Sequence, residues 1–570
     1  MPSPLRRLAI ALALLALGIS GCGGSAKKPA PDPATLVPTT APLYASAIVR
    51  PQGSLKSDAV ADARTLTHQS EPFAALLGGI QVGGSSPSGR PTPAEIESWL
   101  GERAGVFITH LSVPAIKGPG EVPGLLEQAL SGALFAGSSS GGARAQGALV
   151  LDVADSSKAS AFMRGTTATR TATFDGIRYA VAPNGEFYGL VGGFVVIGTE
   201  SGMKEVIAVA HGGAALDANR TYTSLRDSAV KQGVLANLYA ESTALVHATH
   251  VAAGTTAQLF SLLRALAPAG ALYLSLAPES HQIRLDLDAS SGNQPEAPSA
   301  SESEQAANAQ EAFQALPEDS WFALRLSDFG AFAEHLLALE AGGQGSGGGS
   351  SLHGLLGSLG GSFGSLFSSL GPSLERLLAS LAANRAMVDK ELLSWMGPAG
   401  IFVSGSSLAE FNAAAVINAK EPALAREAVA QLPSLLAGSG ASVKPTTVPG
   451  AEAAATVNLT GLPVPLQVGA GKGKFIIGLG LAPVEAALEP SGTLGSSAAY
   501  QQGAKALGEG MQPALLLSVP TLESFANLLG LGSSGTLAQV LADLKSVNTV
   551  TAGTKQLGNV SRTRILLGLG

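Results

Sequence analysis

Residues 177–198 decide the fold and read Ile-Arg-Tyr-Ala-Val-Ala-Pro-Asn-Gly-Glu-Phe-Tyr-Gly-Leu-Val-Gly-Gly-Phe-Val-Val-Ile-Gly. Asn184-Gly185 stands between two strand-like runs, and this dipeptide is a strong signal for a two-residue hairpin turn. Gly192-Gly193 then turns the chain into the apolar run 194–198. The stretch therefore predicts a meander of three strands, in which neighbours are antiparallel.

Helical segments alternate with such strands along the chain. We expect helices over 158–164 and 203–210 in the first half, and over 424–432 and 536–544 in the second half. Because consecutive hairpin strands imply an antiparallel sheet, the fold class is α+β rather than a doubly wound parallel α/β fold.

The chain also contains the same unit twice. Glu95-Ile96-Glu97-Ser98-Trp99-Leu100-Gly101 is followed by Gly105-Val106-Phe107, and Glu391-Leu392-Leu393-Ser394-Trp395-Met396-Gly397 is followed by Gly400-Ile401-Phe402. Tyr44-Ala45 matches Phe322-Ala323, and Tyr222 matches Tyr500, in the same order. Self-similarity of this kind predicts a tandem duplication, in which each unit is an antiparallel sheet of meander hairpins packed with helices.

The matches give the expected domain boundaries. These are a signal peptide over 1–21, a lipidated cysteine with a flexible tether over 22–35, a first unit over 36–290, a linker over 291–315 and a second unit over 316–570. The second unit carries a Gly/Ser/Leu insertion at about 342–373. Each unit has the size of an ordinary domain, so we expect each to fold alone.

The N-terminus predicts export. Arg6 and Arg7 precede an apolar stretch, 8–19, which is shorter than the ~20 residues of a membrane span. Ile19-Ser20-Gly21-Cys22 follows, and Cys22 is the single cysteine of the chain. We expect cleavage between Gly21 and Cys22 and lipidation of Cys22, which would anchor the protein to the outer face of the cytoplasmic membrane.

These last four residues resemble the lipobox of bacterial lipoproteins. Together with the early strand at Tyr44, the two Trp-Gly frames and the duplicated layout, they make the chain similar to a duplicated family of actinobacterial envelope lipoproteins. That family is known only as a domain of unknown function. The resemblance implies location and architecture, and it implies no catalytic residue.

Composition excludes several functions. A net charge of −7 disfavours nucleic acid as a partner, because phosphate binding needs a basic surface. One cysteine excludes an intramolecular disulfide and a cysteine-rich zinc site. No cofactor and no metal site are predicted.

Motifs with chemical potential are weak. Gly137-Ser138-Ser139-Ser140-Gly141 matches the sequence pattern of a nucleophile elbow. It lies in a Gly/Ser run, however, so a loop is expected. Residues 469–474 hint at a phosphate loop, yet lie between two strands like a hairpin turn. His247 and His250, spaced i,i+3, have no third metal ligand nearby in sequence. Trp99 and Trp395 are expected to be core residues, with a pocket wall as the alternative.

One strand carries two carboxylates. Ile283, Leu285 and Leu287 alternate with Arg284, Asp286 and Asp288, which predicts one buried and one solvated face. Acid–base or calcium chemistry is the alternative for Asp286 and Asp288, and a solvated face is the expected interpretation.

The insertion contains an apolar stripe of helical spacing between 352 and 370. Two interpretations remain open: a helix packed on its own domain, and a mobile flap that contacts lipid, an apolar ligand or a partner. The stripe consists of Leu352, Leu355, Leu356, Leu359, Phe363, Leu366, Phe367 and Leu370.

The resulting functional hypothesis is a membrane-anchored extracytoplasmic lipoprotein that is a non-enzymatic binding or scaffold protein of the cell envelope. Its partners would be the membrane, through the N-terminal lipid, and an envelope protein or apolar ligand. The alternatives are a carrier of lipid or another apolar ligand in a cavity, and an envelope hydrolase of unknown type.

Overall fold

The computed structural model describes residues 31–570 except 68–92, 114–143, 167, 230–232, 245–248, 252–269, 291–299, 335–387, 389–391, 408, 437–439, 460–461, 463, 529–540 and 543. The chain forms two compact units. The first comprises Met1–Glu296, Gln556–Arg564 and Gly568–Gly570, and the second comprises Ala297–Lys555 and Ile565–Leu567.

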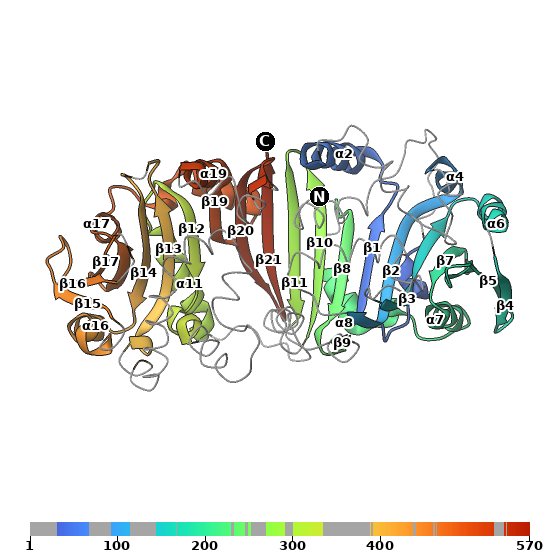
Figure 1. Cartoon of the computed structure of the whole chain (residues 1–570), viewed down its shortest axis with the longest axis horizontal. Helices are drawn as coiled ribbons and strands as arrows, with labels where there is room; N and C mark the ends of the chain where they lie inside the picture. The colour runs from blue at the N-terminus through green and yellow to red at the C-terminus, as the bar shows by residue number, and fades with distance from the viewer. Residues whose placement is uncertain are drawn as a thin grey trace. The chain divides into compact units, whose positions relative to one another are not determined.

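The first unit is one antiparallel sheet, and helices connect its strands along the chain (Figure 1). In space the strands follow the order β11–β10–β8–β1–β2–β3–β7–β6–β5–β4, and β9 adds to β2 in parallel. Its elements are η1 (Pro33–Leu36), β1 (Leu43–Ile48), α2 (Gly53–Thr67), α4 (Pro93–Glu97), β2 (Leu100–Val113), β3 (Arg144–Val153), α6 (Ser156–Gly165), β4 (Arg170–Phe174), β5 (Ile177–Val181), β6 (Phe187–Val191), β7 (Phe194–Gly198), α7 (Glu200–Ala210), η3 (Leu216–Ala218), α8 (Arg220–Ser228), β8 (Ala236–Glu241), β9 (Thr249–Val251), β10 (Ala271–Glu279) and β11 (Gln282–Ser290).

Each face of this sheet contributes to a hydrophobic core, because alternate residues of a strand point to opposite sides. Tyr44 and Val150 join a core with α7 and α8, whereas Ala45 and Leu149 join a second core with α4 and α6. The sheet is therefore the middle layer of the unit.

The meander of residues 177–198 is confirmed, with one difference in its first turn. Ala182 N donates to Glu186 O, and Gly185 N donates to Ala182 O, so the turn is longer than two residues. Only Gly185 has a positive φ there, 84°, whereas both glycines of the next turn do, Gly192 at 59° and Gly193 at 89°. The Asn184 side chain accepts from Glu186 N and thereby stabilises the longer turn.

The second unit repeats the element order of the first. Its strands follow the order β20–β19–β12–β13–β14–β18–β17–β16–β15, all antiparallel. The tandem duplication and the α+β class are confirmed. The described elements are α11 (Ala300–Gln314), β12 (Ser320–Leu326), β13 (Met396–Ser404), β14 (Asn412–Ala419), α16 (Pro422–Leu435), β15 (Ser442–Pro445), β16 (Ala453–Asn458), β17 (Leu466–Gly471), β18 (Lys474–Leu479), α17 (Ala482–Leu488), η5 (Leu494–Ser496), α18 (Ala498–Leu507), β19 (Gln512–Ser518), α19 (Val519–Leu528) and β20 (Val547–Leu557).

The compact units do not end where the repeats were expected to end. The predicted linker, 291–315, contains helix α11, whose Phe313 is fully buried in the core of the second unit. The last strand, β21 (Val560–Leu569), begins within a segment that belongs to the first unit and pairs with β11. The first unit is therefore completed by residues from the far end of the chain.

The repeated tryptophans are core residues, as expected. The ring centroids of Trp99 and Phe162 lie 5.3 Å apart in the first unit, and those of Trp395 and Phe475 lie 5.1 Å apart in the second. Both indoles are almost completely buried.

Candidate functional site

Several residues named from sequence lie outside the described part of the chain. They are Gly21, Cys22, Gly137–Gly141, His247 and the apolar stripe from Leu352 to Leu370. The backbone of His250 lies in strand β9 rather than on a helix.

Lys472 and Gly473, with φ of 52° and 76°, form the tight turn between β17 and β18, so the turn interpretation of residues 469–474 is confirmed. Within the described ranges, no three His, Cys, Asp or Glu side chains gather closely enough to hold a metal ion.

The first unit contains a cavity of about 430 Å³. Its walls come from β1, β2, α8, β8 and β10, and from the residue that caps η1. Its size falls within the ~300–1,000 Å³ range of small-molecule sites. The lining residues are Asp32, Ser46, Ala47, Ile48, Arg103, Tyr222, Arg226, Asp227, Ala229, Val234, Leu235, Asn237 and Tyr273.

Four tyrosines cluster at this place. Tyr222 meets Tyr44 and Tyr239 edge to face, with ring centroids 5.9 and 5.3 Å apart, and Tyr273 lies 6.2 Å away. Burial raises the pKa of all four phenols, that of Tyr239 to about 12. The hydroxyls therefore stay protonated near neutral pH and can donate hydrogen bonds.

Strand pairing shows which residues of the second unit correspond to this cavity. Ser46 pairs with Gly105, and Arg325 pairs with Gly400. Because Gly105-Val106-Phe107 and Gly400-Ile401-Phe402 are the matched frames, Ser46 and Arg325 are equivalent. Tyr44 then corresponds to Ala323, so the expected match of Tyr44 to Phe322 is wrong by one residue.

In the second unit the side chains at the corresponding position hydrogen-bond to one another. Arg325 donates to Gln310 Oε1, to Gln512 Oε1 at 3.1 Å and to Thr554 Oγ1 at 2.7 Å. The hydroxyl of Tyr500, the counterpart of Tyr222, accepts from the side-chain amides of Gln310 and Gln314, both at 2.7 Å. The cavity of the first unit is thus lined by a serine at the position where the second unit has this arginine.

Helix α8 carries three lining residues, and its N-terminus is capped as the sequence allows. Asn219 Oδ1 accepts from Thr221 N and Tyr222 N. At the other end, Ser228 O accepts from Arg562 Nη2 at 2.6 Å. A guanidinium at a helix C-terminus is favourable because the last carbonyls carry partial negative charge.

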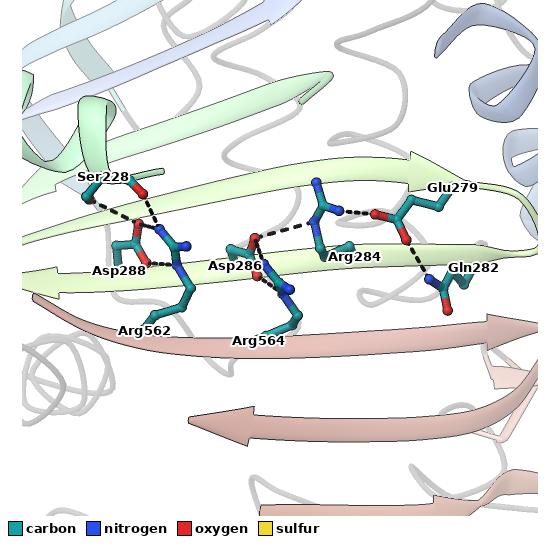
Figure 2. Close-up of polar contacts among 8 residues, drawn as sticks. All are labelled: Ser228, Glu279, Gln282, Arg284, Asp286, Asp288, Arg562 and Arg564. Atoms are coloured by element: carbon teal, nitrogen blue, oxygen red, sulfur yellow. Dashed lines mark hydrogen bonds and ion pairs between the residues drawn. The ribbon is translucent and has the colours of Figure 1, made fainter. Parts of the chain in front are cut away.

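Arg562 and Arg564 also pair with the carboxylates of β11 (Figure 2). Arg562 Nε and Nη2 donate to Asp288 Oδ1 and Oδ2 at 2.7 and 2.8 Å. Arg564 Nε and Nη2 donate to Asp286 Oδ1 and Oδ2 at 2.6 and 3.0 Å. Arg284 adds an ion pair to Asp286 at 3.4 Å and a second one to Glu279.

The expected solvated face of β11 is therefore wrong. Asp286 and Asp288 are each only 1% exposed, and Arg562 is 7% exposed. The hydrogen bonds to Asp288 raise the pKa of Arg562. Strand β21 covers this edge and supplies the two arginines, so the carboxylates serve to position the strand and α8 rather than to meet water.

Sequence reasoning missed the cavity and this pairing. Two signals were available. Arg562-Thr563-Arg564 repeats the i,i+2 spacing of Asp286 and Asp288 with opposite charge, and Ser46 stands where the second repeat has Arg325. The first signal could have been found by searching the sequence for strands with matching spacing and opposite charge. The second signal could be found only once the strand register was known.

The described residues define a class: an α+β protein of two tandem repeats, with a polar cavity in the first. The chain belongs to the family described as "Protein of unknown function (DUF3352)", whose model matches residues 8–569. No curated protein matches the chain. The solved structures titled "Structure of crystal form III of TP0453" and "Structure of crystal form IV of TP0453" match with 10% identity and a TM-score of 0.24. They cover 47% and 45% of this chain, and 82% and 79% of their own chains. A TM-score this low supports no conclusion about the fold or function of this chain.

Proposed function

We propose that this protein is a lipid-anchored binding protein of the cell envelope, which holds a small molecule in the cavity of its first unit and is not an enzyme. The observation that supports the proposal is the contrast between the repeats: Ser46 lines the cavity of the first unit, whereas the equivalent Arg325 of the second unit donates hydrogen bonds to three neighbouring side chains. Both repeats need the same residues to fold. A difference in a lining residue that only one repeat carries therefore favours a function specific to that repeat.

The lining favours binding over catalysis. Proton transfer is most efficient when the pKa of the catalytic group lies near the working pH. Burial moves the pKa of Tyr222 and Tyr273 upward, away from neutrality. These hydroxyls suit the recognition of a ligand. The charged side chains Arg103 and Arg226 also favour a polar ligand over the purely apolar ligand that a lipid-tail carrier would hold.

Replacing Ser46 by arginine tests the binding role, because the chain itself uses arginine at the equivalent position. We expect purified wild-type protein to retain a small molecule in native mass spectrometry, and Ser46→Arg to fold, to fill the cavity and to lose that molecule. Ser57→Arg is the matched control, since Ser57 is exposed on α2 and does not line the cavity. Equal retention of ligand by all three proteins would contradict the cavity as the binding site.

Replacing Cys22 by alanine tests the anchor. The proposal rests on the sequence Ile19-Ser20-Gly21-Cys22, since Cys22 supplies the thiol that would carry the lipid. Within the described residues, no helix combines the length and the apolarity needed to cross a membrane. We expect Cys22→Ala to move the protein from the detergent phase to the aqueous phase, and Ser25→Ala, outside the motif, to leave it in place. Detergent-phase retention of Cys22→Ala would show another mode of attachment.

A further inference from the structure

We propose that the ligand of this cavity carries an oxyanion, a phosphate or a carboxylate, and that Arg103 and Arg226 bind it. The inference rests on the proposed binding function and adds the chemical class of the ligand. It follows from which hydrogen-bonding groups of the cavity wall are already used within the protein.

The side-chain acceptors of the wall are engaged within the protein or lie beside an arginine. Asp32 Oδ1 accepts from Ala34 N at 3.0 Å, as the N-cap of η1. Asn237 Oδ1 accepts from Ser46 Oγ at 3.0 Å, which leaves the N–H groups of the Asn237 amide as donors. The two carboxylates of the wall each lie beside an arginine: Asp32 Oδ2 is 4.0 Å from the Arg103 guanidinium, and Asp227 Oδ1 accepts from Arg226 Nε at 3.4 Å.

The donors are available in excess. Arg103 Nε is buried and has no hydrogen-bond partner among the described residues. The Arg103 guanidinium approaches Asp32 Oδ2 only to 4.0 Å, which is beyond hydrogen-bonding distance. Arg226 lies over the Tyr222 ring, 5.6 Å from its centroid, and meets Asp227 through Nε at 3.4 Å. Each guanidinium has five N–H donors, and most of them have no partner among the residues that the structure describes.

The two tyrosines add neutral donors. No hydrogen bond joins the Tyr222 or Tyr273 hydroxyl to another described residue, and both rings line the cavity. A wall of guanidinium, phenol and amide donors matches the oxygen atoms of a phosphate or a carboxylate, and arginine binds both groups through paired N–H bonds. Such a group would satisfy the buried Nε of Arg103.

Binding of inorganic phosphate to the full chain tests the assignment. We expect saturable stabilisation against heat by phosphate, measured against sodium chloride of equal ionic strength. Arg103→Met and Arg226→Met should each weaken the apparent affinity at least tenfold, and Ser46→Arg should abolish it. Arg178→Met is the matched control, because Arg178 is exposed on β5 and does not line the cavity. Unchanged melting of Arg103→Met in chloride alone would show that this variant folds. Arg103→Lys keeps the positive charge but not the paired N–H groups of the guanidinium, so it should recover part of the affinity.

A second arm identifies the source of the oxyanion. Vesicles of phosphatidylglycerol and vesicles of phosphatidylcholine are compared with free phosphate. Binding to phosphatidylglycerol that both arginine variants lose assigns a lipid headgroup, and binding to free phosphate alone assigns a soluble ligand. Equal stabilisation by chloride and phosphate, or an unchanged response in both arginine variants, would overturn the inference. If Ser46→Arg displaces a neutral or cationic molecule, the binding function stands and the oxyanion assignment fails; if no molecule is ever retained, the binding function itself fails.

Discussion

Replacing Arg562 by methionine is expected to lower the free energy of unfolding of the first unit by about 3–5 kcal/mol. The substitution leaves the Asp288 carboxylate buried, 1% exposed, without the guanidinium that donates to both of its oxygens. It also removes the donor to Ser228 O at the end of α8. Urea denaturation followed by hydrogen exchange measures the effect, because exchange reports the first unit separately from the second.

Two variants make this prediction specific. The double variant Asp288→Leu with Arg562→Met removes both charges and should recover much of the lost stability, since apolar residues can replace a buried ion pair at little cost. Arg178→Met, on the surface of the same unit, should change stability by no more than about 0.5 kcal/mol. A loss as small for Arg562→Met as for Arg178→Met would contradict the role of the buried pair.

Separating the first repeat from the C-terminal segment is expected to have a still larger effect. A fragment of residues 31–296 lacks both Arg562 and Arg564, so Asp286 and Asp288 lose their bidentate partners together. We expect this fragment not to form a stable fold at pH 7, in contrast to the expectation from repeat boundaries alone. Circular dichroism and thermal melting of the fragment are the measurements.

The control for this fragment follows from strand direction. Arg562 pairs with Asp288 and Arg564 with Asp286, so β21 runs antiparallel to β11 and begins beside the end of β11. Residues 556–570 joined to 31–296 by a short flexible linker should therefore restore cooperative melting. Cooperative melting of 31–296 alone at pH 7 would show that the first unit does not need the C-terminal segment.

The sequence was sufficient for local structure and for the duplication. Turn signals such as Gly192-Gly193 act between neighbouring residues, and the frames around Trp99 and Trp395 repeat because both units need the same core. These features depend on short-range chemistry, which a single sequence displays directly.

The cavity and the ion pairs depend on residues that are far apart in the chain. Asp288 and Arg562 are separated by 274 positions, and an alternating strand such as β11 looks solvated until the strand that covers it is known. Likewise, the equivalence of Ser46 and Arg325 follows only from their pairing with Gly105 and Gly400. An alignment that is wrong by one residue matches Ser46 to a different residue of the second unit. Lipidation of Cys22 and the role of the stripe from Leu352 to Leu370 stay predictions.

We expect a ligand to occupy the first unit and not the second. Hydrogen-exchange mass spectrometry of the full chain, as purified and after removal of bound small molecules by unfolding and refolding, tests it most directly. We expect faster exchange after ligand removal in the cavity segments 46–48, 220–229 and 234–237, and unchanged exchange in the equivalent segments 325–327 and 498–507. Unchanged exchange throughout, or faster exchange in the second unit instead, would contradict it.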